Sequence, residues 1–221
     1  MIILAIEMSA TQNDVALLRG NTVVARRTWN AREFHHTRLF ELLPELFREA
    51  GVSAAQIELF AVGRGPGSFS GTRVALTAAQ ALAMPGGQPV IAVSSGEALA
   101  HEIAAAGDAE KIAVLGDARR DTIWLGVFDG KTGTPLIPPP WTLLPLAQLG
   151  TVLPAGTKIV SPDWHRLATL WPANLAAPNA DSFPSAEFVA RLALERHARG
   201  LPSDPLVPIY LHPAVATLSK K

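Results

Sequence analysis

Short apolar runs alternate with segments of helical periodicity through the first 107 residues, and few folds accommodate their order. Three predicted strands come first, at 2–6, 15–19 and 22–27, and Gly20-Asn21 forms a turn between the last two. Predicted helices follow at 35–50, in the alanine-rich stretch that ends before Pro85, and from Ser94 toward Gly107. Single predicted strands at 59–62 and 90–93 separate these helices. The order is therefore strand, strand, strand, helix, strand, helix, strand, helix.

This order is the ribonuclease-H-like plan, a mixed sheet in which helical crossovers join the parallel strands. A second round begins after Lys111, with strands expected at 112–116 and 122–128 and a third short strand after the turn at 130–133. Fourteen of the eighteen prolines lie from Pro135 onward, so only short elements are expected before a helix at 185–199. We predict an α/β protein with an actin-like (ASKHA) duplicated fold: an N-terminal lobe of residues 1–107 and a smaller, eroded lobe of residues 108–221.

Composition excludes several classes of protein. Hydrophobic residues make up 48% of the chain and charged residues 17%, which predicts a packed globular protein. Nineteen basic and nineteen acidic residues give zero net charge, so any contact with nucleic acid is expected to be local or made through a partner. There is no cysteine, and no apolar run approaches the length that a membrane span needs. The amino terminus has neither the basic lead nor the apolar length of a signal peptide, so a cytoplasmic protein is expected.

A glycine-rich loop between the strand at 59–62 and the following helix is the sharpest local motif. Glycines there permit either a phosphate cradle at the helix start or a turn that packs the helix on the sheet. The loop is not a Walker motif, because no Gly-Lys-Ser/Thr follows it. The spacing of its glycines favours a turn that packs the helix on the sheet. The loop residues singled out are Gly65, Pro66, Gly67, Ser68, Phe69, Gly71 and Arg73.

Catalytic chemistry has little support in the residues. The first phosphate-loop position, Glu7 to Thr11, lacks glycine, and no His-x-x-x-His pair offers two metal ligands on one helical face. The charged turn at Asp117, Arg119, Arg120 and Asp121 is either a solvated hairpin or a polar ligand site, and the hairpin is the simpler interpretation. We therefore predict no catalytic residues, no metal and no cofactor.

The first two helices have apolar arcs wider than one sheet requires. On the second helix the polar stripe is narrow, and small alanines around the rest permit close approach of another helix. Such breadth indicates burial without naming what covers it, so burial within the chain's own lobe is the alternative to a partner surface. The candidate interface residues are His36, Leu39, Phe40, Leu43, Phe47, Val74, Ala75, Ala78 and Leu82.

Several of these stretches together resemble the TsaB family, also called YeaZ, which is related to the glycoprotease-like TsaD proteins. The loop at 65–73 is similar to the family signature almost residue for residue, and the opening strand at 3–9, the helix start at 36–44, the turn at 117–119 and the stretch 208–211 also resemble TsaB. Glu7 stands where the family usually has aspartate.

The resemblance implies a non-catalytic subunit that pairs with TsaD, the transferase that adds threonylcarbamoyl to an adenosine beside the anticodon of tRNA. It implies TsaE as a third member, a homodimer when the protein is alone, and a helical surface shared by both kinds of pairing. Two rivals stay open: a glycoprotease-like hydrolase or small-molecule kinase that uses the cleft between the lobes, and a module that binds a nucleotide without turnover.

Overall fold

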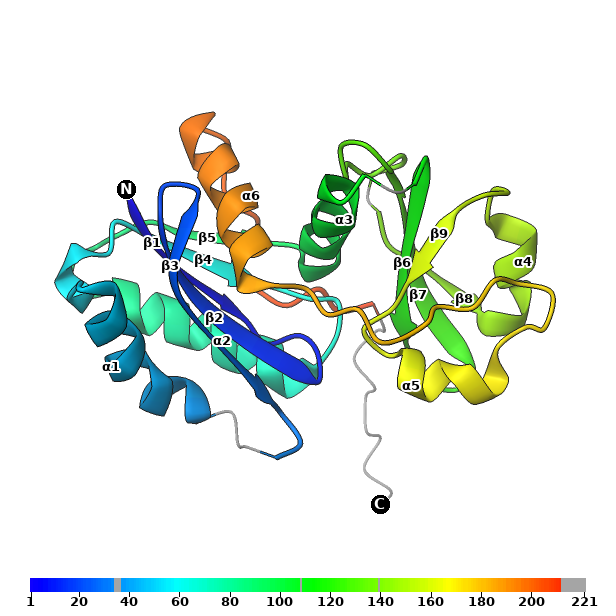
Figure 1. The fold of residues 1–221 in the computed structure, drawn as a ribbon, viewed down its shortest axis with the longest axis horizontal. Helices are drawn as coiled ribbons and strands as arrows, with labels where there is room; N and C mark the ends of the chain where they lie inside the picture. The colour runs from blue at the N-terminus through cyan, green and yellow to red at the C-terminus, as the bar shows by residue number, and fades with distance from the viewer. Residues whose placement is uncertain (34–36, 108, 139, 212–221) are drawn as a thin grey trace, which may run out of the picture.

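The computed structural model describes residues 1–33, 37–107, 109–138 and 140–211. Two sheets lie side by side (Figure 1). The first sheet contains β1 (Ile2–Glu7), β2 (Gln12–Arg19), β3 (Thr22–Asn30), β4 (Leu59–Gly63) and β5 (Val90–Val93) in the order β3-β2-β1-β4-β5. β1, β2 and β3 pair antiparallel, whereas β4 pairs parallel with β1 and β5 parallel with β4.

The second sheet repeats the order of the first four strands. It contains β6 (Lys111–Asp117), β7 (Thr122–Asp129), β8 (Thr142–Pro145) and β9 (Lys158–Val160) in the order β8-β7-β6-β9. β6 pairs antiparallel with β7 and parallel with β9, as β1 does with β2 and β4. The chain therefore has the duplicated, actin-like architecture that the strand order predicts.

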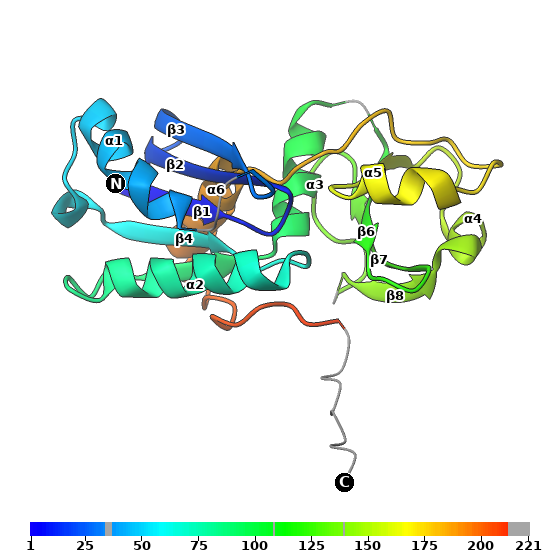
Figure 2. The same ribbon diagram turned by 90° about the horizontal axis from the view of Figure 1, so that it is seen from below.

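Alternation along β1 explains how the first sheet is covered on both faces. Leu4 and Ile6 point into a core shared with α1 (Arg38–Ala50) and α2 (Phe69–Ala83). Ile3 and Ala5 point the other way, into a core shared with α6 (Ala186–Ala198). Figures 1 and 2 show α2 and α6 on opposite faces of this sheet.

Two helices each pack on the sheet that is not their neighbour in the chain. α3 (Ser95–Ala105) follows the last strand of the first sheet, yet its Leu99 and Ala104 pack into the core of the second sheet with Ile112. α6 lies near the end of the chain and packs against the first sheet. The predicted boundary between residues 107 and 108 separates the two sheets. It does not separate the two cores, because α6 lies after the boundary and packs on the first sheet.

The proline-rich part forms only short elements, as predicted. These are the helices α4 (Leu149–Val152) and α5 (Trp164–Leu167) and the 3-10 turns η2 (Leu146–Gln148) and η3 (Ala168–Leu170). The strand predicted directly after residue 133 is reduced to a single bridge between Phe128 and Pro135, and β8 begins only at Thr142. Prolines at 135, 138 and 140 explain the delay, because they have no N–H to donate to a neighbouring strand.

The structure defines the ends of several helices and turns. α1 begins at Arg38, and the start predicted at residue 35 lies outside the described residues. At the 3-10 turn η1 (Ala54–Gln56), the N–H of Ser53 donates to Gln56 Oε1 at 2.8 Å. At the start of α3, Ser94 Oγ accepts from the N–H of Glu97, and the Glu97 carboxylate pairs with Arg196. In the described part of the chain no helix is long and apolar enough to cross a membrane.

The Asp14 carboxylate fastens α6 to the first sheet. Its side chain is 1% exposed and accepts a 2.8 Å hydrogen bond from the N–H of Ala186, the first residue of α6. The Arg26 guanidinium lies 2.7 Å away and offsets the cost of burying the charge. Burial raises the pKa of Asp14, against the hydrogen bond and charge of Arg26, which lower it.

We expect Asp14→Ala to lower the free energy of unfolding by about 1–3 kcal/mol, because the hydrogen bond from Ala186 and the ion pair with Arg26 are both lost. Glu49→Ala is the matched control, since it removes the exposed pair of Glu49 with Arg27 on the same strand β3 and should change stability little. Urea denaturation at pH 7 measures both. Equal effects of the two variants would contradict the role given to Asp14.

Candidate functional site

Three loops meet at a cleft of about 930 Å³ between the lobes. The loop after β1 contributes Ser9 to Thr11, the loop after β4 contributes Pro66 to Ser70, and the turn after β6 contributes Asp117 to Arg119. Because β1 and β6 hold the same place in the two sheets, their loops face each other across the cleft. The remaining lining residues are Ala31, Arg32, Thr72, Trp124, Asp163, Arg166 and residues 208–211.

The glycines of the signature loop are required by close packing. A side-chain carbon at Gly67 would lie 2.2 Å from the carbonyl oxygen of Ser9, and one at Gly71 would lie 2.0 Å from the carbonyl oxygen of Met8. The N–H of Ser68 donates to the Ser9 oxygen at 2.6 Å, and Ser68 Oγ in turn accepts from the N–H of Gly71. The loop therefore packs α2 against the end of β1, which favours the structural interpretation of the motif over a phosphate cradle.

Glu7 does not reach the cleft. It is 0% exposed, and its Oε1 accepts a 2.6 Å hydrogen bond from the N–H of Ser9. Its Oε2 occupies the space that the missing side chain of Gly63 leaves, 1.8 Å from where a carbon there would stand, and has no hydrogen-bond partner among the described residues. Burial raises the pKa of Glu7, against the hydrogen bonds from Ser9. The carboxyl is thus turned into the core beneath the loop.

On the second-lobe side of the cleft, two carboxylates are bonded to groups of the protein itself. Asp117 accepts from the N–H of Arg119 at 2.7 Å and lies 3.2 Å from the Arg119 guanidinium and 3.6 Å from that of Arg166. Asp163 accepts from the N–H of Asp117 at 3.1 Å. Burial raises the pKa of Asp163, against this hydrogen bond. Internal contacts therefore occupy both carboxylates.

The turn that carries these contacts is conformationally unusual. Arg119, Arg120 and Asp121 have φ values of 72°, 53° and 57°, a left-handed run that residues with side chains rarely adopt. The N–H of Thr122 donates to Arg119 O, and the N–H of Ala118 to Thr122 O, so the turn closes as a hairpin. This agrees with the hairpin interpretation of the charged turn. The described residues also contain no group of three or more side chains able to hold a metal ion.

The structure divides the candidate interface residues. Leu39, Leu43, Ala75 and Ala78 are at most 4% exposed in the core of the first lobe, so a partner cannot contact them in this conformation. For these four, burial within the chain's own lobe explains the apolar arc. Phe40 is 49% exposed, and Phe47, Val74 and Leu82 are half-buried. His36 lies outside the described residues.

The stripe of Arg73, Thr77, Gln80 and Met84 along α2 and its end faces away from the core. Met84 is 77% exposed, and Phe69 at the other end of the helix is 56% exposed. The Arg73 guanidinium lies 5.1 Å from the centre of the Phe69 ring, and the Tyr210 ring lies 5.6 Å from it. Large apolar side chains thus remain exposed on the outer side of α1 and α2.

Sequence reasoning missed Asp163 and Arg166 as part of the cleft. Asp163 is the N-cap of the four-residue helix α5 and Arg166 is its third residue, in a region whose elements are too short to give a periodic signal. Their contacts with Asp117 join two segments almost fifty residues apart, and a local sequence pattern cannot predict such a contact.

Comparisons with known proteins find two related groups of proteins, TsaD and TsaB. Residues 27–136 match the family model described as TsaD, tRNA N6-adenosine threonylcarbamoyltransferase. The chain is 27% identical to the tRNA threonylcarbamoyladenosine biosynthesis protein TsaB of Escherichia coli, over 98% of this chain and 96% of that protein. It is 32% identical to TsaB of Bacillus subtilis over 60% of this chain, a match that spans only 57% of the Bacillus protein. The solved structure of YeaZ from Pseudomonas aeruginosa superposes with a TM-score of 0.79 at 29% identity, over 95% of this chain and 99% of that one.

We expect Glu7→Gln to remove a pH dependence of stability. The raised pKa means that the folded state disfavours the ionised carboxyl, so the parent loses stability as the pH rises from about 4.5 through the raised value. The glutamine variant has no such loss and should equal or exceed the parent at pH 8. Denaturant midpoints measured between pH 5 and pH 8 test this.

Asp129→Asn is the control for that series. Hydrogen bonds from Thr132 lower the pKa of Asp129, so the control should keep the parent's slope between pH 5 and pH 8. The same slope in Glu7→Gln and in the parent would show that Glu7 does not titrate in this way.

Proposed function

We propose, since this chain belongs to the TsaB (YeaZ) family, that it takes part in the synthesis of threonylcarbamoyladenosine in tRNA. In this proposal it is a non-catalytic subunit that binds and activates TsaD, with TsaE as a further member of the assembly. The tRNA is reached through the assembly, since the chain has no net charge with which to hold a polyanion.

The contacts of the carboxylates in the cleft and beneath it support the non-catalytic part of the proposal. A nucleotide-hydrolysing site needs carboxylates free to hold a cation or to orient water. Glu7 is buried beneath the loop, and Asp117 and Asp163 are held by backbone N–H groups and by arginines. Recruiting either aspartate would break these contacts and leave an arginine or an N–H group without its partner.

The outer side of α1 and α2 supports the partner-binding part. Exposed Phe40, Phe69 and Met84 stand on, or at the end of, helices that cover one face of the first sheet. Aromatic, methionine and arginine side chains are the types enriched at protein interfaces. The TsaD family model matches residues 27–136, which include both helices, so a TsaD partner carries related helices. Related faces can pack about an approximate twofold axis, and the same faces of two copies can form a homodimer.

We expect Phe40→Glu and Met84→Glu each to weaken TsaD binding about 100-fold or more, which corresponds to about 2.7 kcal/mol, because an unpaired charge loses its hydration in the interface. Both residues are exposed in the single chain, so both variants should stay folded. Leu170→Glu is the control: Leu170 is 56% exposed on the second lobe and should not affect binding. Calorimetry with purified TsaD, with circular dichroism as the folding check, measures these effects.

Unchanged affinity in both variants would place the interface elsewhere, and failure of the parent chain to bind TsaD would overturn the partner role. Ala78→Glu is not a useful test, because Ala78 is 2% exposed and a glutamate there would disrupt the lobe's own core.

The cleft volume keeps the enzyme and nucleotide-binding alternatives testable, because about 930 Å³ is large enough for a small ligand. We expect the purified chain to show no hydrolysis of ATP or peptides above the buffer rate, and no heat of ATP binding. ATP turnover that disappears in Asp117→Ala would favour the kinase or hydrolase. Binding without turnover would favour the nucleotide module.

A further inference from the structure

Residues 201–211, here called the C-terminal strap, leave α6 after Gly200 and run along the edge of the first sheet. The N–H of Ala92 in β5 donates to Ser203 Oγ at 3.1 Å, and Ala92 and Asp204 form an antiparallel bridge. Figure 2 shows the strap, coloured orange to red, passing from the first lobe toward the second. The strap thus covers an edge strand that would otherwise be open to pairing.

The far half of the strap contacts both lobes. Arg64 Nε donates to Val207 O at 3.0 Å, and the N–H of Ile209 donates to Arg64 O at 2.9 Å. Leu206 packs against the core of the first lobe. Leu211 packs against the core of the second lobe, which contains Trp124. Within a few residues the strap passes from one lobe to the other.

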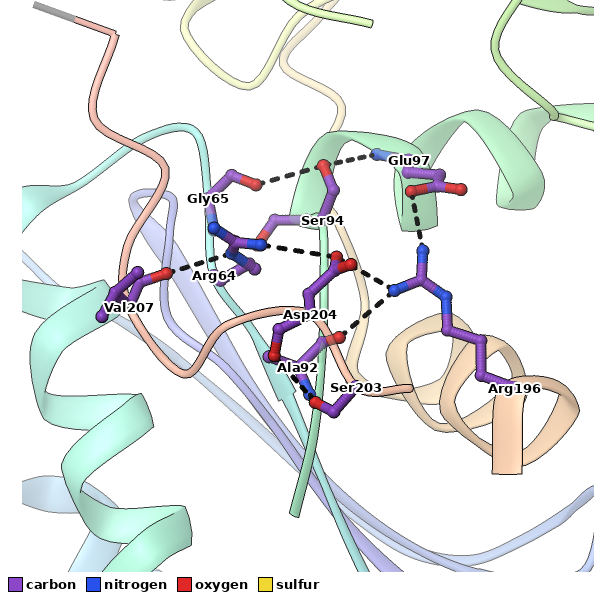
Figure 3. Close-up of polar contacts among 10 residues, drawn as sticks. Arg64, Gly65, Ala92, Ser94, Glu97, Arg196, Ser203, Asp204 and Val207 are labelled. Carbon is purple, nitrogen blue, oxygen red and sulfur yellow. Dashed lines mark hydrogen bonds and ion pairs between the residues drawn. The ribbon is translucent and has the colours of Figure 1, made fainter. Parts of the chain in front are cut away.

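The strap is also tied to the start of the signature loop. Arg64, which holds Val207 and Ile209, directly precedes Gly65. The carbonyl oxygen of Gly65 accepts from Ser95 N–H at 2.9 Å and from Ser94 Oγ at 3.2 Å. The same short stretch therefore connects the strap, the loop that begins α2, and the amino end of α3 (Figure 3).

Arg196 on α6 is the centre of the contacts in Figure 3. Its guanidinium donates to the carbonyl oxygen of Ala92 at 3.3 Å and to Glu97 at 3.2 Å, and lies 3.0 Å from Asp204. Asp204 also lies 3.5 Å from Arg64. The Arg196 side chain is 19% exposed and that of Arg64 14%, so water screens these charges far less than at an exposed pair.

Arg196 joins the two exchanged helices. It belongs to α6, which packs on the first sheet, whereas Glu97 belongs to α3, which packs on the second. Its contacts with Asp204 and Ala92 add the strap and β5 to the same group. The guanidinium therefore bonds at once to elements of both lobes and to the segment that crosses between them.

We propose that the C-terminal strap is a clamp between the lobes, fastened by Arg196, and that it sets the opening of the cleft and the position of the signature loop. This role belongs to the chain itself and does not depend on the partner proposed above. Arg199 supplies a contrast on the same helical segment, because its pair with Glu195 is exposed at both ends, at 66% and 49%.

Hydrogen exchange on the full-length chain tests the fastening. Arg196→Met keeps most of the side-chain length and removes the charge, whereas Arg199→Met makes the same change at the exposed pair. We expect Arg196→Met to speed exchange about 10-fold or more in peptides that contain Ile209 and in those that span residues 64–69, because opening of the strap becomes easier. Peptides from β1 and β6 should keep the parent's rates. Arg199→Met should match the parent throughout.

The distance between lobes is the second measurement. The chain has no cysteine, so Ala81→Cys and Leu170→Cys place one spin label on the exposed surface of each lobe. Pulsed electron resonance should give a broader distance distribution in Arg196→Met than in the parent or in Arg199→Met. If Arg196→Met does not fold, Asp204→Asn takes its place, because it weakens the strap contact and leaves the pair of Arg196 with Glu97. Unchanged exchange and an unchanged distribution in the folded variant would overturn the clamp.

Discussion

Each sheet has two apolar faces, and the need to cover both with helices governs this molecule. α1 and α2 cover one face of the first sheet, and the other packs mainly against α6, which comes far later in the chain. Conversely, α3 follows the last strand of the first sheet but packs against the second sheet. Exchange of helices makes the two lobes interdependent, so the cleft between them has a defined shape although the second lobe is built from short elements.

The cleft keeps its place between the two lobes, but the carboxylates around it are bonded to groups of the protein itself. The loops after β1 and β6 still face each other, as duplication of the sheet requires. Their polar groups now stabilise the loops themselves: Glu7 holds Ser9, and Asp163 holds the N–H of Asp117. Buried charges need partners, and partners supplied by the protein leave less for a ligand.

Local patterns predicted the order of strands and helices because periodicity is a property of neighbouring residues. The glycine at 67 could be assigned to close packing for the same reason, though only the structure shows that the carbonyl group of Ser9 is what it approaches. The alanines of α2 show the limit: small side chains indicate that something comes close, and Ala78 turns out to approach the lobe's own sheet. Long-range pairings, such as Asp14 with the start of α6, have no signature in sequence spacing.

The exchange of helices also sets the order in which the protein can mature on the ribosome. The first sheet is translated before α6, the helix that shields one of its faces and ends at Ala198. Until that helix emerges, Ile3, Leu18 and Leu59 stand on an uncovered apolar surface. A nascent chain in this condition is prone to aggregation, so the first sheet is fully covered only after α6 has been translated.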